Sequence, residues 1–457
     1  MPAFDAIVIG TGQAGPSLAH RLTKAGLRVA VIERQRFGGT CVNTGCTPTK
    51  TLVASAYAAH LARRAGEFGV AIEGGVRVDM QKVKQRKDYV LGFSERGVER
   101  RLRDNANIVV YHDHAHFVSP SEIMVGSETL TAPKIFINVG GRASIPDIPG
   151  LAEVGYLTNS SLLELDVLPG HLIILGGSYV GLEFAQAFHR FGSKVTVIEA
   201  GPRLIAREDE DTSTAVAEIL AGEGIELVLG AKELKVGKRG SDIVVSMQTD
   251  GAGKDVVGSH LLIAVGRRPN TDDLGLEKAG VAIDPHGYIR VDDELRSNVP
   301  GIWAVGDCNG KGAFTHTSYN DFEIVAANLF DGDRRRVSDR ITAYNLYIDP
   351  PLGRIGMTEA EVRKTGRPAL MATMAMENVS RAFEKGETLG FMKILVDAAS
   401  KHILGASILG VGGDEVIHSL LTLMYAKAPY TVMQRGVYIH PTVSELLPTM
   451  LGDLKPL

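Results

Sequence analysis

Two cysteines separated by four residues carry the clearest chemistry in this sequence. Cys41 and Cys46 are two of only three cysteines in a chain of 457 residues. A disulfide needs Cα atoms roughly 4.4 to 6.8 Å apart, and residues five apart on a regular helix exceed that separation. The backbone between them must therefore leave the helical path, and Gly45 permits such a turn. The spacing favours a redox-active pair; a structural bridge and two buried thiols are the alternatives.

A helix is predicted to start close behind the second cysteine. Pro48 is tolerated in the first turn of a helix and not deeper, so a helix is expected from Pro48 to about Arg64. Cys46 then lies near a helix N-terminus, where partial positive charge lowers the pKa of a thiol and favours the reactive thiolate. The cytosol keeps thiols reduced, so a cysteine pair there is more often catalytic than structural.

Length and composition predict a soluble globular protein of two or three domains. The 457 residues exceed one ordinary hydrophobic core. The formal net charge of -4 gives no reason to expect nucleic acid or an anionic membrane as a partner. No apolar run reaches membrane-spanning length, and no targeting segment precedes the first apolar strand, so we expect a cytoplasmic protein.

A glycine-rich turn near the N-terminus predicts a dinucleotide site. Gly10, Gly12 and Gly15 follow an apolar strand and open a helical stretch, and a second strand ends at Glu33. Such glycines let the backbone approach a pyrophosphate at the helix N-terminus, and the terminal acid can bond ribose hydroxyls. The alternative is that Glu33 is only an exposed acid at the end of a strand.

The same pattern recurs at a constant distance of 166 positions. The repeated residues are Gly10, Gly15 and Glu33, which return as Gly176, Gly181 and Glu199. An internal repeat at constant offset is far more specific than either motif alone. One chain is therefore predicted to bind two dinucleotides. From about Arg340 the sequence changes to strand-like runs and helices without nucleotide motifs, which predicts a third, mixed domain.

The sequence resembles the class I pyridine nucleotide-disulfide oxidoreductases, the family of dihydrolipoamide dehydrogenase, glutathione reductase and mercuric reductase. The resemblance covers essentially the whole chain and rests on the first glycine motif, GGTCVNTGCTPTK, GGSYVGLE, AVGRRPN, WAVGD and HPTVSE. It implies an α/β fold with two Rossmann-like dinucleotide-binding domains, for FAD and NAD(P), plus an α+β C-terminal dimerisation domain. The implied segments are FAD-binding 1–148, NAD(P)-binding 149–269, a second, central FAD-binding segment 270–338, and dimerisation 339–457.

The resemblance implies FAD and NADH as cofactors. The residues expected to hold FAD are Gly10, Gly12, Gly15, Glu33, Gly39, Thr40, Gly140 and Asp307. Those expected to hold the nicotinamide nucleotide are Gly176, Ser178, Tyr179, Gly181, Glu199 and Gly266. Glu199 would bond a ribose diol and repel a 2′-phosphate, which favours NADH, although NADPH stays possible because Arg203 and Arg207 follow closely. Tyr179 matches an aromatic gate over the flavin; its alternative is simple packing.

The resemblance also implies the order of electron transfer from nicotinamide through FAD to the cysteine pair. Cys46 matches the thiolate in contact with the flavin, and Cys41 matches the thiol that exchanges with the substrate. Lys50 matches a lysine beside the flavin N5 atom, and Glu183 matches its ion-pair partner. Taken alone, Lys50 and Glu183 could both be surface charges.

The motif near the C-terminus implies a homodimer whose active site is shared across subunits. His440 matches an acid-base histidine from the other subunit, and Glu445 would fix its tautomer and raise its basicity. Without the family, a histidine before a proline is more often structural. No metal site is predicted, because His316 could touch substrate or metal but stands alone. Cys308 is expected to be a small buried filler.

Departures from the family pattern leave the electron acceptor open. No cysteine follows Cys308, so the C-terminal cysteine pair of mercuric reductases and the C-terminal redox relay of large thioredoxin reductases are both missing. The stretches 315–321 and 350–359 look closer to the mercuric-reductase-like bacterial group that includes the reactive-chlorine-resistance flavoprotein, which is associated with copper(II) reduction. The leading prediction is an NAD(P)H oxidoreductase of a small disulfide. The alternatives are a metal-ion reductase acting on Cu(II) or Hg(II), and a flavin-loaded redox sensor with little turnover.

Overall fold

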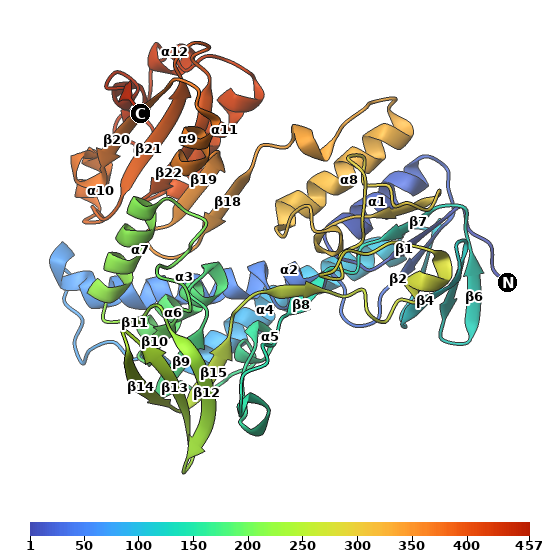
Figure 1. The fold of residues 1–457 in the computed structure, drawn as a ribbon, viewed down its shortest axis with the longest axis horizontal. Coiled ribbons are helices and arrows are strands. Elements are labelled where there is room, and N and C mark those ends of the chain that lie inside the picture. Colours follow the sequence, from blue (N-terminus) through green and yellow to red (C-terminus); the bar gives the residue numbers. More distant parts are fainter.

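The first sheet gathers strands from both halves of the chain, in a computed structural model that describes residues 1–457 (Figure 1). Its five parallel strands lie in the order β17-β7-β1-β2-β3. They are β1 (Ala6–Ile9), β2 (Val29–Ile32), β3 (Ile108–Tyr111), β7 (Ile135–Ile137) and β17 (Ile302–Ala304). Strands buried on both faces read as continuous apolar runs, as these do. The chain leaves this sheet after β7 and returns to it with β17.

Different elements cover the two faces of this sheet. Helices α1 (Ala14–Lys24) and α8 (Thr315–Phe330) pack on one face, where Leu18, Ile324 and Phe136 share a core. The other face packs through Phe117 and Leu130 against an antiparallel sheet. That sheet contains β4 (Ala115–Ser119), β5 (Glu122–Val125) and β6 (Glu128–Thr131). The first glycine turn lies between β1 and α1, at the carboxyl ends of the parallel strands, where such sheets bind ligands.

A second parallel sheet repeats this arrangement in the middle of the chain. Its order is β11-β10-β9-β15, with β9 (His171–Leu175), β10 (Lys194–Ile198), β11 (Glu226–Val228) and β15 (His260–Ile263). Helices α6 (Tyr179–Phe191) and α7 (Glu210–Gly222) cover one face through Phe184 and Val216. The other face packs through Val245 against antiparallel strands β12 (Lys232–Arg239), β13 (Asp242–Thr249) and β14 (Ala252–Gly258).

The C-terminal part forms an antiparallel sheet of order β18-β19-β22-β21-β20-β23, which Figure 1 draws beside α7. Its strands are β18 (Ala343–Leu346), β19 (Leu352–Gly356), β20 (Ala369–Ala375), β21 (Phe391–Asp397), β22 (Ile403–Leu409) and β23 (Lys455–Pro456). Its helices are α9 (Glu359–Thr365), α10 (Ser380–Glu384), α11 (Gly413–Tyr425), α12 (Thr431–Gln434) and α13 (Leu446–Met450). The predicted fold class is confirmed; the exact limits of the four segments stay a prediction.

Three helices between β2 and β3 carry the cysteine pair toward the second sheet. They are α2 (Gly39–Asn43), α3 (Cys46–Arg64) and α4 (Met80–Arg103). Leu52 and Ala56 of α3 share a core with Phe184 of α6. Helix α3 begins two residues before the predicted Pro48, because proline is accepted throughout the first turn of a helix. The remaining α-helix is α5 (Asn159–Leu162), and the remaining strands are the pair β8 (Gly141–Ala143) and β16 (Arg267–Pro269).

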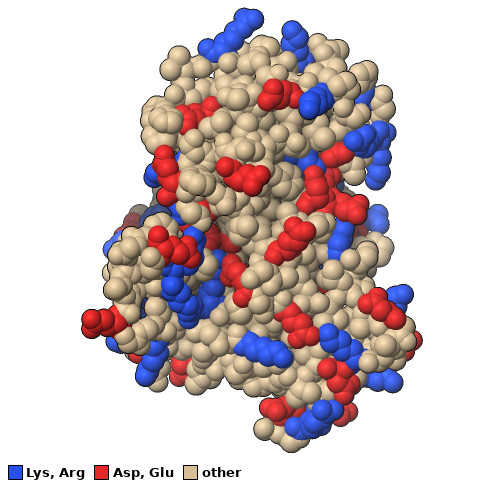
Figure 2. Space-filling model, turned by 90° about the vertical axis from the view of Figure 1, so that its left-hand side faces the viewer, with Lys and Arg blue, Asp and Glu red and all other residues tan.

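The surface mixes charges of both signs. Figure 2 shows acidic and basic side chains interspersed over the face that it presents. None of the helices combines the length and the apolar character needed to cross a bilayer. Among the exposed apolar side chains, Val437 and Ile439 stand out at 102% and 81% exposure, next to His440.

Candidate active site

The two cysteines lie on either side of a break between two helices. Cys41 belongs to α2, and Cys46 is the first residue of α3. Gly45 makes the break with φ −133° and ψ −119°, and a Cβ there would lie 2.9 Å from the backbone oxygen of Thr40. Both cysteines are free thiols in this structure, Cys41 partly buried and Cys46 exposed. The required departure from a regular helix is therefore present where Gly45 predicted it.

The surroundings of the pair shift the pKa values of the two thiols in opposite directions. A hydrogen bond from Cys41 is the main cause that lowers the pKa of Cys46 to about 6, and the Thr315 hydroxyl at 3.2 Å and the charge of Lys50 act in the same direction. The same hydrogen bond, followed by burial, raises the pKa of Cys41 far above its usual value. At neutral pH the pair therefore holds one thiolate, on Cys46, and one thiol, on Cys41.

Lys50 and Glu183 form an ion pair beside the thiols, although 133 positions separate them in the sequence. The Lys50 Nζ atom lies 2.6 Å from Glu183 Oε2, and the glutamate side chain is only 5% exposed. The second oxygen of Glu183 accepts a hydrogen bond from the Tyr347 backbone N–H at 3.0 Å, and Lys50 lies 4.7 Å from the centre of the Tyr347 ring. The partnership that the resemblance implied is thus present in the structure.

The first glycine turn is closed by a side chain that the sequence reading did not single out. Gly10 has φ 98°, and a Cβ there would lie 2.3 Å from the backbone oxygen of Asn138. A Cβ at Gly15 would lie 2.3 Å from the Gly10 oxygen. Asn138 accepts a hydrogen bond from the Gly15 N–H and donates one to the Val305 carbonyl, both at 2.9 Å. Only glycine fits at either position, and Asn138 ties the turn to β7 and β17.

Two acids border this first turn. Glu33 is buried; its Oε2 accepts hydrogen bonds from the Thr11 N–H and hydroxyl at 3.0 and 2.6 Å, and its Oε1 accepts one from the Gln35 N–H at 2.9 Å. A carboxylate has about four acceptor positions, so one stays free on Glu33. The Asp307 carboxylate accepts no hydrogen bond from any other residue and lies 3.7 Å from Arg267. Burial raises the pKa of Asp307.

The other residues expected at the flavin also gather here. A Cβ at Gly39 would lie 2.7 Å from the Gly12 Cα atom, so the start of α2 packs directly against the glycine turn. The Thr40 hydroxyl donates to the Gly141 carbonyl at 3.4 Å, and Gly140 has φ 64°. Contacts between α2 and the β7–β8 turn therefore close one side of the first motif.

The second glycine turn has the same backbone form. A Cβ placed on Gly176 would lie 2.4 Å from the backbone oxygen of Ala264. A Cβ placed on Gly181 would lie 2.1 Å from the backbone oxygen of Gly176. Glu199 accepts hydrogen bonds from the N–H groups of Gly177 and Gly201, each at 2.7 Å and one on each oxygen. Each oxygen of Glu199 therefore keeps one free acceptor position.

The remaining residues of the second motif lie around this turn. Ser178 is exposed, and Gly266 has φ 133°. Tyr179 is the first residue of α6, partly buried, with its ring edge-to-face against Tyr344 at 5.5 Å. Arg203 donates to the Ala206 carbonyl at 3.0 Å.

The predicted acid-base pair makes no hydrogen bond to the thiols of the same chain. His440 Nδ1 lies 3.0 Å from both oxygens of Glu445, and these are its only polar contacts. The His440 side chain is 74% exposed and that of Glu445 is 13% exposed. His316 bonds the Ala343 carbonyl at 2.7 Å through Nε2, and no group of three or more possible metal ligands occurs in the structure. Cys308 is fully buried, as expected of a filler.

Several residues at this site were not picked out from the sequence. Asn138 follows an apolar strand that ends in glycines, and a lone polar residue there was the available signal. Thr315 lies in a stretch that departs from the family pattern, where the neighbouring His316 is the residue predicted to touch substrate or metal. Arg267 lies in the AVGRRPN motif, but no role is predicted for it there, and Tyr347 lies in no motif; the partners of both residues come from distant parts of the chain.

Two family models match the chain and together cover nearly all of it. The model described as pyridine nucleotide-disulphide oxidoreductase matches residues 4–321. The dimerisation domain of the same family matches residues 342–451. The family resemblance drawn from the motifs is therefore confirmed.

Individual relatives align over comparable lengths. An Escherichia coli (strain K12) protein named "Probable pyridine nucleotide-disulfide oxidoreductase RclA" is 37% identical over 463 residues, covering 100% of both proteins. A mercuric reductase of Bacillus cereus is 32% identical over 446 residues, covering 95% of this chain and 70% of the relative. The Cu(II) complex of the HOCl-induced flavoprotein disulfide reductase RclA from Escherichia coli matches with a TM-score of 0.90 at 36% identity, covering 99% of each chain.

Proposed function

The chain belongs to the pyridine nucleotide-disulphide oxidoreductase family, and on that premise we propose that it oxidises NADH and delivers the electrons through Cys41 and Cys46 to a small disulfide. The observation that carries this proposal is the place of Cys46, which is the first residue of α3 and has the Thr315 hydroxyl 3.2 Å from its sulfur. Lys50, Thr315 and the hydrogen bond between the two sulfurs all favour the thiolate on Cys46. A reduced dithiol in that state is prepared for exchange with a disulfide.

The first motif fits an FAD. Its glycine turn allows the backbone close to a pyrophosphate, Glu33 keeps a free acceptor position for a ribose hydroxyl, and the Asp307 carboxylate is open to donors of a ligand. When bound, FAD supplies a two-electron link between the nicotinamide nucleotide and the cysteine pair. Lys50 would place a positive charge beside the ring, with Glu183 holding the lysine in position.

The cysteines would then act in sequence. The Cys41 thiolate attacks one sulfur of the acceptor, which forms a mixed disulfide and releases the first thiolate product. The Cys46 thiolate attacks the Cys41 sulfur, closes the disulfide between the two cysteines and releases the second product. The acceptor gains two electrons and, with two protons, leaves as two thiols. Because the pKa of Cys41 is raised, its first step needs a base.

His440 of the partner subunit would be that base. Within one chain His440 is 74% exposed and bonds only Glu445, whose carboxylate would fix the tautomer. The exposed Val437 and Ile439 beside it are apolar surface that a second copy of the chain would bury. The proposed histidine takes the proton of Cys41 and gives it to the first leaving thiolate.

Mixing two inactive variants tests the shared site. His440→Ala lacks the base and Cys46→Ser lacks the thiolate, so each homodimer is expected to be inactive. Hybrid dimers contain one site with both groups intact, and activity should return as subunits exchange. Demonstrated hybrids with no activity would mean that each site is built within one chain.

We propose NADH rather than NADPH as the electron donor. Both oxygens of Glu199 keep an acceptor position free for the two hydroxyls of a ribose, and the carboxylate would repel a 2′-phosphate. The value of kcat/KM with each nucleotide measures the preference directly. A higher value with NADPH would overturn this choice and point to Arg203 and Arg207 as its cause.

A metal ion is the second candidate for the acceptor. One similar solved structure is a Cu(II) complex of the Escherichia coli flavoprotein disulfide reductase RclA. Cu(II) or Hg(II) would then be a substrate reduced by the thiolates. This differs from the leading proposal only in where the electrons end.

A turnover screen separates the candidates. The purified protein is assayed with NADH and NADPH against lipoamide, glutathione disulfide and Cu(II), with Cys41→Ser as the matched variant. Turnover of a disulfide that Cys41→Ser abolishes supports the leading proposal, and turnover of Cu(II) alone supports the second. If none of these acceptors is reduced, a redox sensor is favoured. Full activity of Cys41→Ser would mean that the electrons bypass the cysteines.

A further inference from the structure

One buried carboxylate joins the second dinucleotide motif to the C-terminal sheet. Glu208 lies just before α7, and its side chain has no exposed surface. Its Oε1 atom accepts hydrogen bonds from two phenols, Tyr179 at 3.0 Å and Tyr344 at 2.7 Å. Its Oε2 atom accepts one from the Arg354 Nε–H at 2.9 Å. Tyr179 comes from α6, whereas Tyr344 and Arg354 come from β18 and β19.

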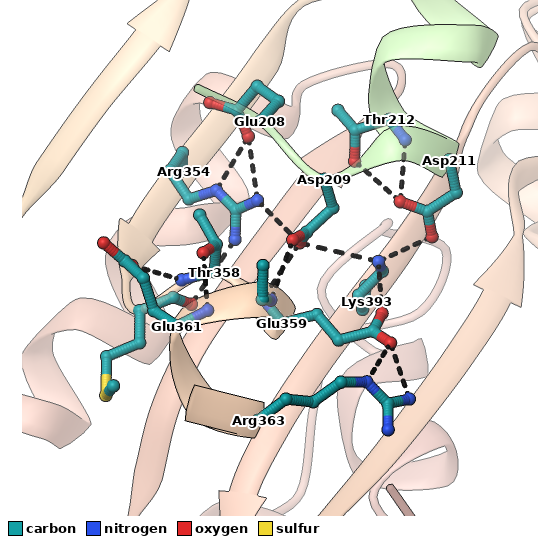
Figure 3. Close-up of polar contacts among 12 residues, drawn as sticks. Glu208, Asp209, Asp211, Thr212, Arg354, Thr358, Glu359, Glu361, Arg363 and Lys393 are labelled. Carbon is teal, nitrogen blue, oxygen red and sulfur yellow. Dashed lines mark hydrogen bonds and ion pairs between the residues drawn. The ribbon is translucent and has the colours of Figure 1, made fainter. Parts of the chain in front are cut away.

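A network of charges fixes the position of this carboxylate (Figure 3). Arg354 is 1% exposed and also bonds Asp209 at 3.0 Å. The equally buried Lys393 lies 3.6 Å from Asp209, 2.5 Å from Asp211 and 3.0 Å from Glu359. Because each buried charge has partners on several elements, moving Glu208 would unpair charges that are costly to leave unpaired. Glu208 is therefore a stationary acceptor.

The two phenols on Glu208 differ in their freedom. Tyr344 is packed on both sides, stacked on Phe314 at 5.5 Å and 11° and edge-to-face with Tyr179. Tyr179 lies at the first residue of α6, between the exposed residues Ser178 and Val180. If the Tyr179 ring moves, Tyr344 and Arg354 still bond Glu208. The movement then breaks one hydrogen bond without leaving a bare buried carboxylate.

We propose that Glu208 is the latch of the Tyr179 gate, and that Tyr344 sets the strength of the latch by keeping Glu208 satisfied when the gate opens. The inference rests on the proposed function and on the gate role that the family resemblance implies for Tyr179, whose ring must move before the nicotinamide ring can bind. Glu208 and Tyr344 are positioning residues, since they act through Tyr179. The affinity for the nicotinamide half of the coenzyme is thereby set by a contact with the C-terminal sheet.

Calorimetric titration of the oxidised holoenzyme tests the latch with two probes. NAD⁺ carries the nicotinamide ring and needs the gate to open, whereas ADP-ribose lacks that ring and needs no opening. Tyr179→Phe removes the hydroxyl and keeps the ring, so NAD⁺ should bind roughly fivefold more tightly, because a hydrogen bond to a charged acceptor no longer has to break. ADP-ribose affinity should not change.

Tyr344→Phe should act in the opposite direction. Opening the gate then leaves Glu208 Oε1 without any donor, so NAD⁺ should bind roughly fivefold more weakly, again with ADP-ribose unchanged. In the Tyr179→Phe background the same substitution should have no effect on NAD⁺, because Oε1 then has no bond to lose on opening. This non-additivity is what a double-mutant cycle detects. In turnover, both single variants should change KM for NADH more than kcat.

The outcomes separate the latch from the function on which it rests. Failure of the wild-type holoenzyme to bind either nucleotide would overturn the proposed function. Normal wild-type binding with equal shifts for both probes, no shift for NAD⁺, or additive effects of the two substitutions would overturn the latch alone. Glu208→Gln keeps an acceptor for the phenols and weakens it, so a folded variant should bind NAD⁺ more tightly; both phenylalanine variants keep the test decisive if this one does not fold.

Discussion

The two dinucleotide motifs of this chain share one backbone design and differ in what surrounds it. In each motif a terminal glutamate accepts hydrogen bonds from two backbone N–H groups, those of Thr11 and Gln35 in the first and those of Gly177 and Gly201 in the second. Each donor of the first motif lies 166 positions before its counterpart in the second, Thr11 before Gly177 and Gln35 before Gly201. The repeat therefore extends from the sequence pattern to individual hydrogen bonds.

The surroundings differ in how firmly each turn is held. The Asn138 side chain joins the first turn at Gly15 to the Val305 carbonyl, while the equivalent position in the second motif is Ala264, which has no polar side chain. The start of α2 packs on Gly12, while the corresponding Ser178 is exposed. A clamped and covered turn suits a cofactor that stays, and an open one suits a nucleotide that binds and leaves in each cycle. The proposed roles of the two motifs follow this difference.

The largest expected effect comes from filling the same close contact in each motif. Gly15→Ala and Gly181→Ala would each force a Cβ to within 2.3 or 2.1 Å of a backbone oxygen, which costs about 3 kcal/mol or more where the backbone must shift. Gly15→Ala should yield protein without bound flavin, read by its absorbance. Gly181→Ala should keep its flavin and lose at least about a hundredfold in reduction by NADH.

Gly237→Ala is the control for these two substitutions, because nothing lies within 4 Å of its Cβ position. It should change neither flavin content nor reduction rate. If Gly181→Ala were the flavin-free variant, the roles of the two motifs would have to be exchanged.

The clamp on the first turn should account for a smaller part of stability. Asn138→Ala leaves the Gly15 N–H without a partner in the interior and the Val305 carbonyl with only the weak Cys308 S–H donor at 3.5 Å, and we expect the free energy of unfolding to fall by about 2 kcal/mol. Chemical denaturation of the holoenzyme measures the change. The matched substitution in the second motif, Ala264→Ser, should alter stability by less than about 0.5 kcal/mol. Equal losses would remove the distinction between a clamped and an open turn.

The ion pair that joins the two halves should tune the thiolate. With the pKa of Cys46 lowered to about 6, half of this thiol is ionised near that pH, so alkylation of reduced protein by iodoacetamide should be half-maximal near pH 6 and level off at higher pH. Lys50→Met should move the midpoint upward and slow alkylation at pH 6 by roughly threefold to tenfold, because the cation no longer attracts the thiolate. Peptide mass spectrometry measures the rate at Cys46.

Glu183→Gln should shift the pH midpoint of Cys46 alkylation in the opposite direction to Lys50→Met. Glu183 opposes the thiolate electrostatically, so its neutralisation should lower the midpoint for Cys46. A midpoint near 9.0, the ordinary thiol value, in the unaltered protein would contradict the assignment of the thiolate.

The smallest effect is expected at the two terminal acids. Glu199→Gln removes the charge that repels a 2′-phosphate from a partly exposed site, and the ratio of kcat/KM for NADPH to that for NADH should rise roughly threefold. Glu33→Gln should leave that ratio unchanged, because the first motif does not bind the coenzyme in our proposal. A change in the ratio caused by Glu33→Gln would again break the division of roles.

The sequence by itself determined the local geometry of this protein. The strand, glycine turn, helix and terminal acid lie within about 25 residues of each other in both motifs, so their pattern predicts the turn without knowledge of the rest. The cysteine spacing, Gly45 and Pro48 likewise predicted a break followed by a helix. Only the first residue of that helix differed, at Cys46, since a proline fixes a helix start to within one turn.

Tertiary structure alone decided which distant side chains meet at the site. Thr315 reaches Cys46 across 269 positions, Asn138 reaches Gly15 across 123, and Tyr344 reaches Glu208 across 136. None of these contacts leaves a local pattern, because each depends on where α8, the end of β7 and β18 come to lie beside residues that are remote in the sequence. The sequence therefore fixes the turns that bind, while packing between remote elements sets the charge and the freedom of the groups around them.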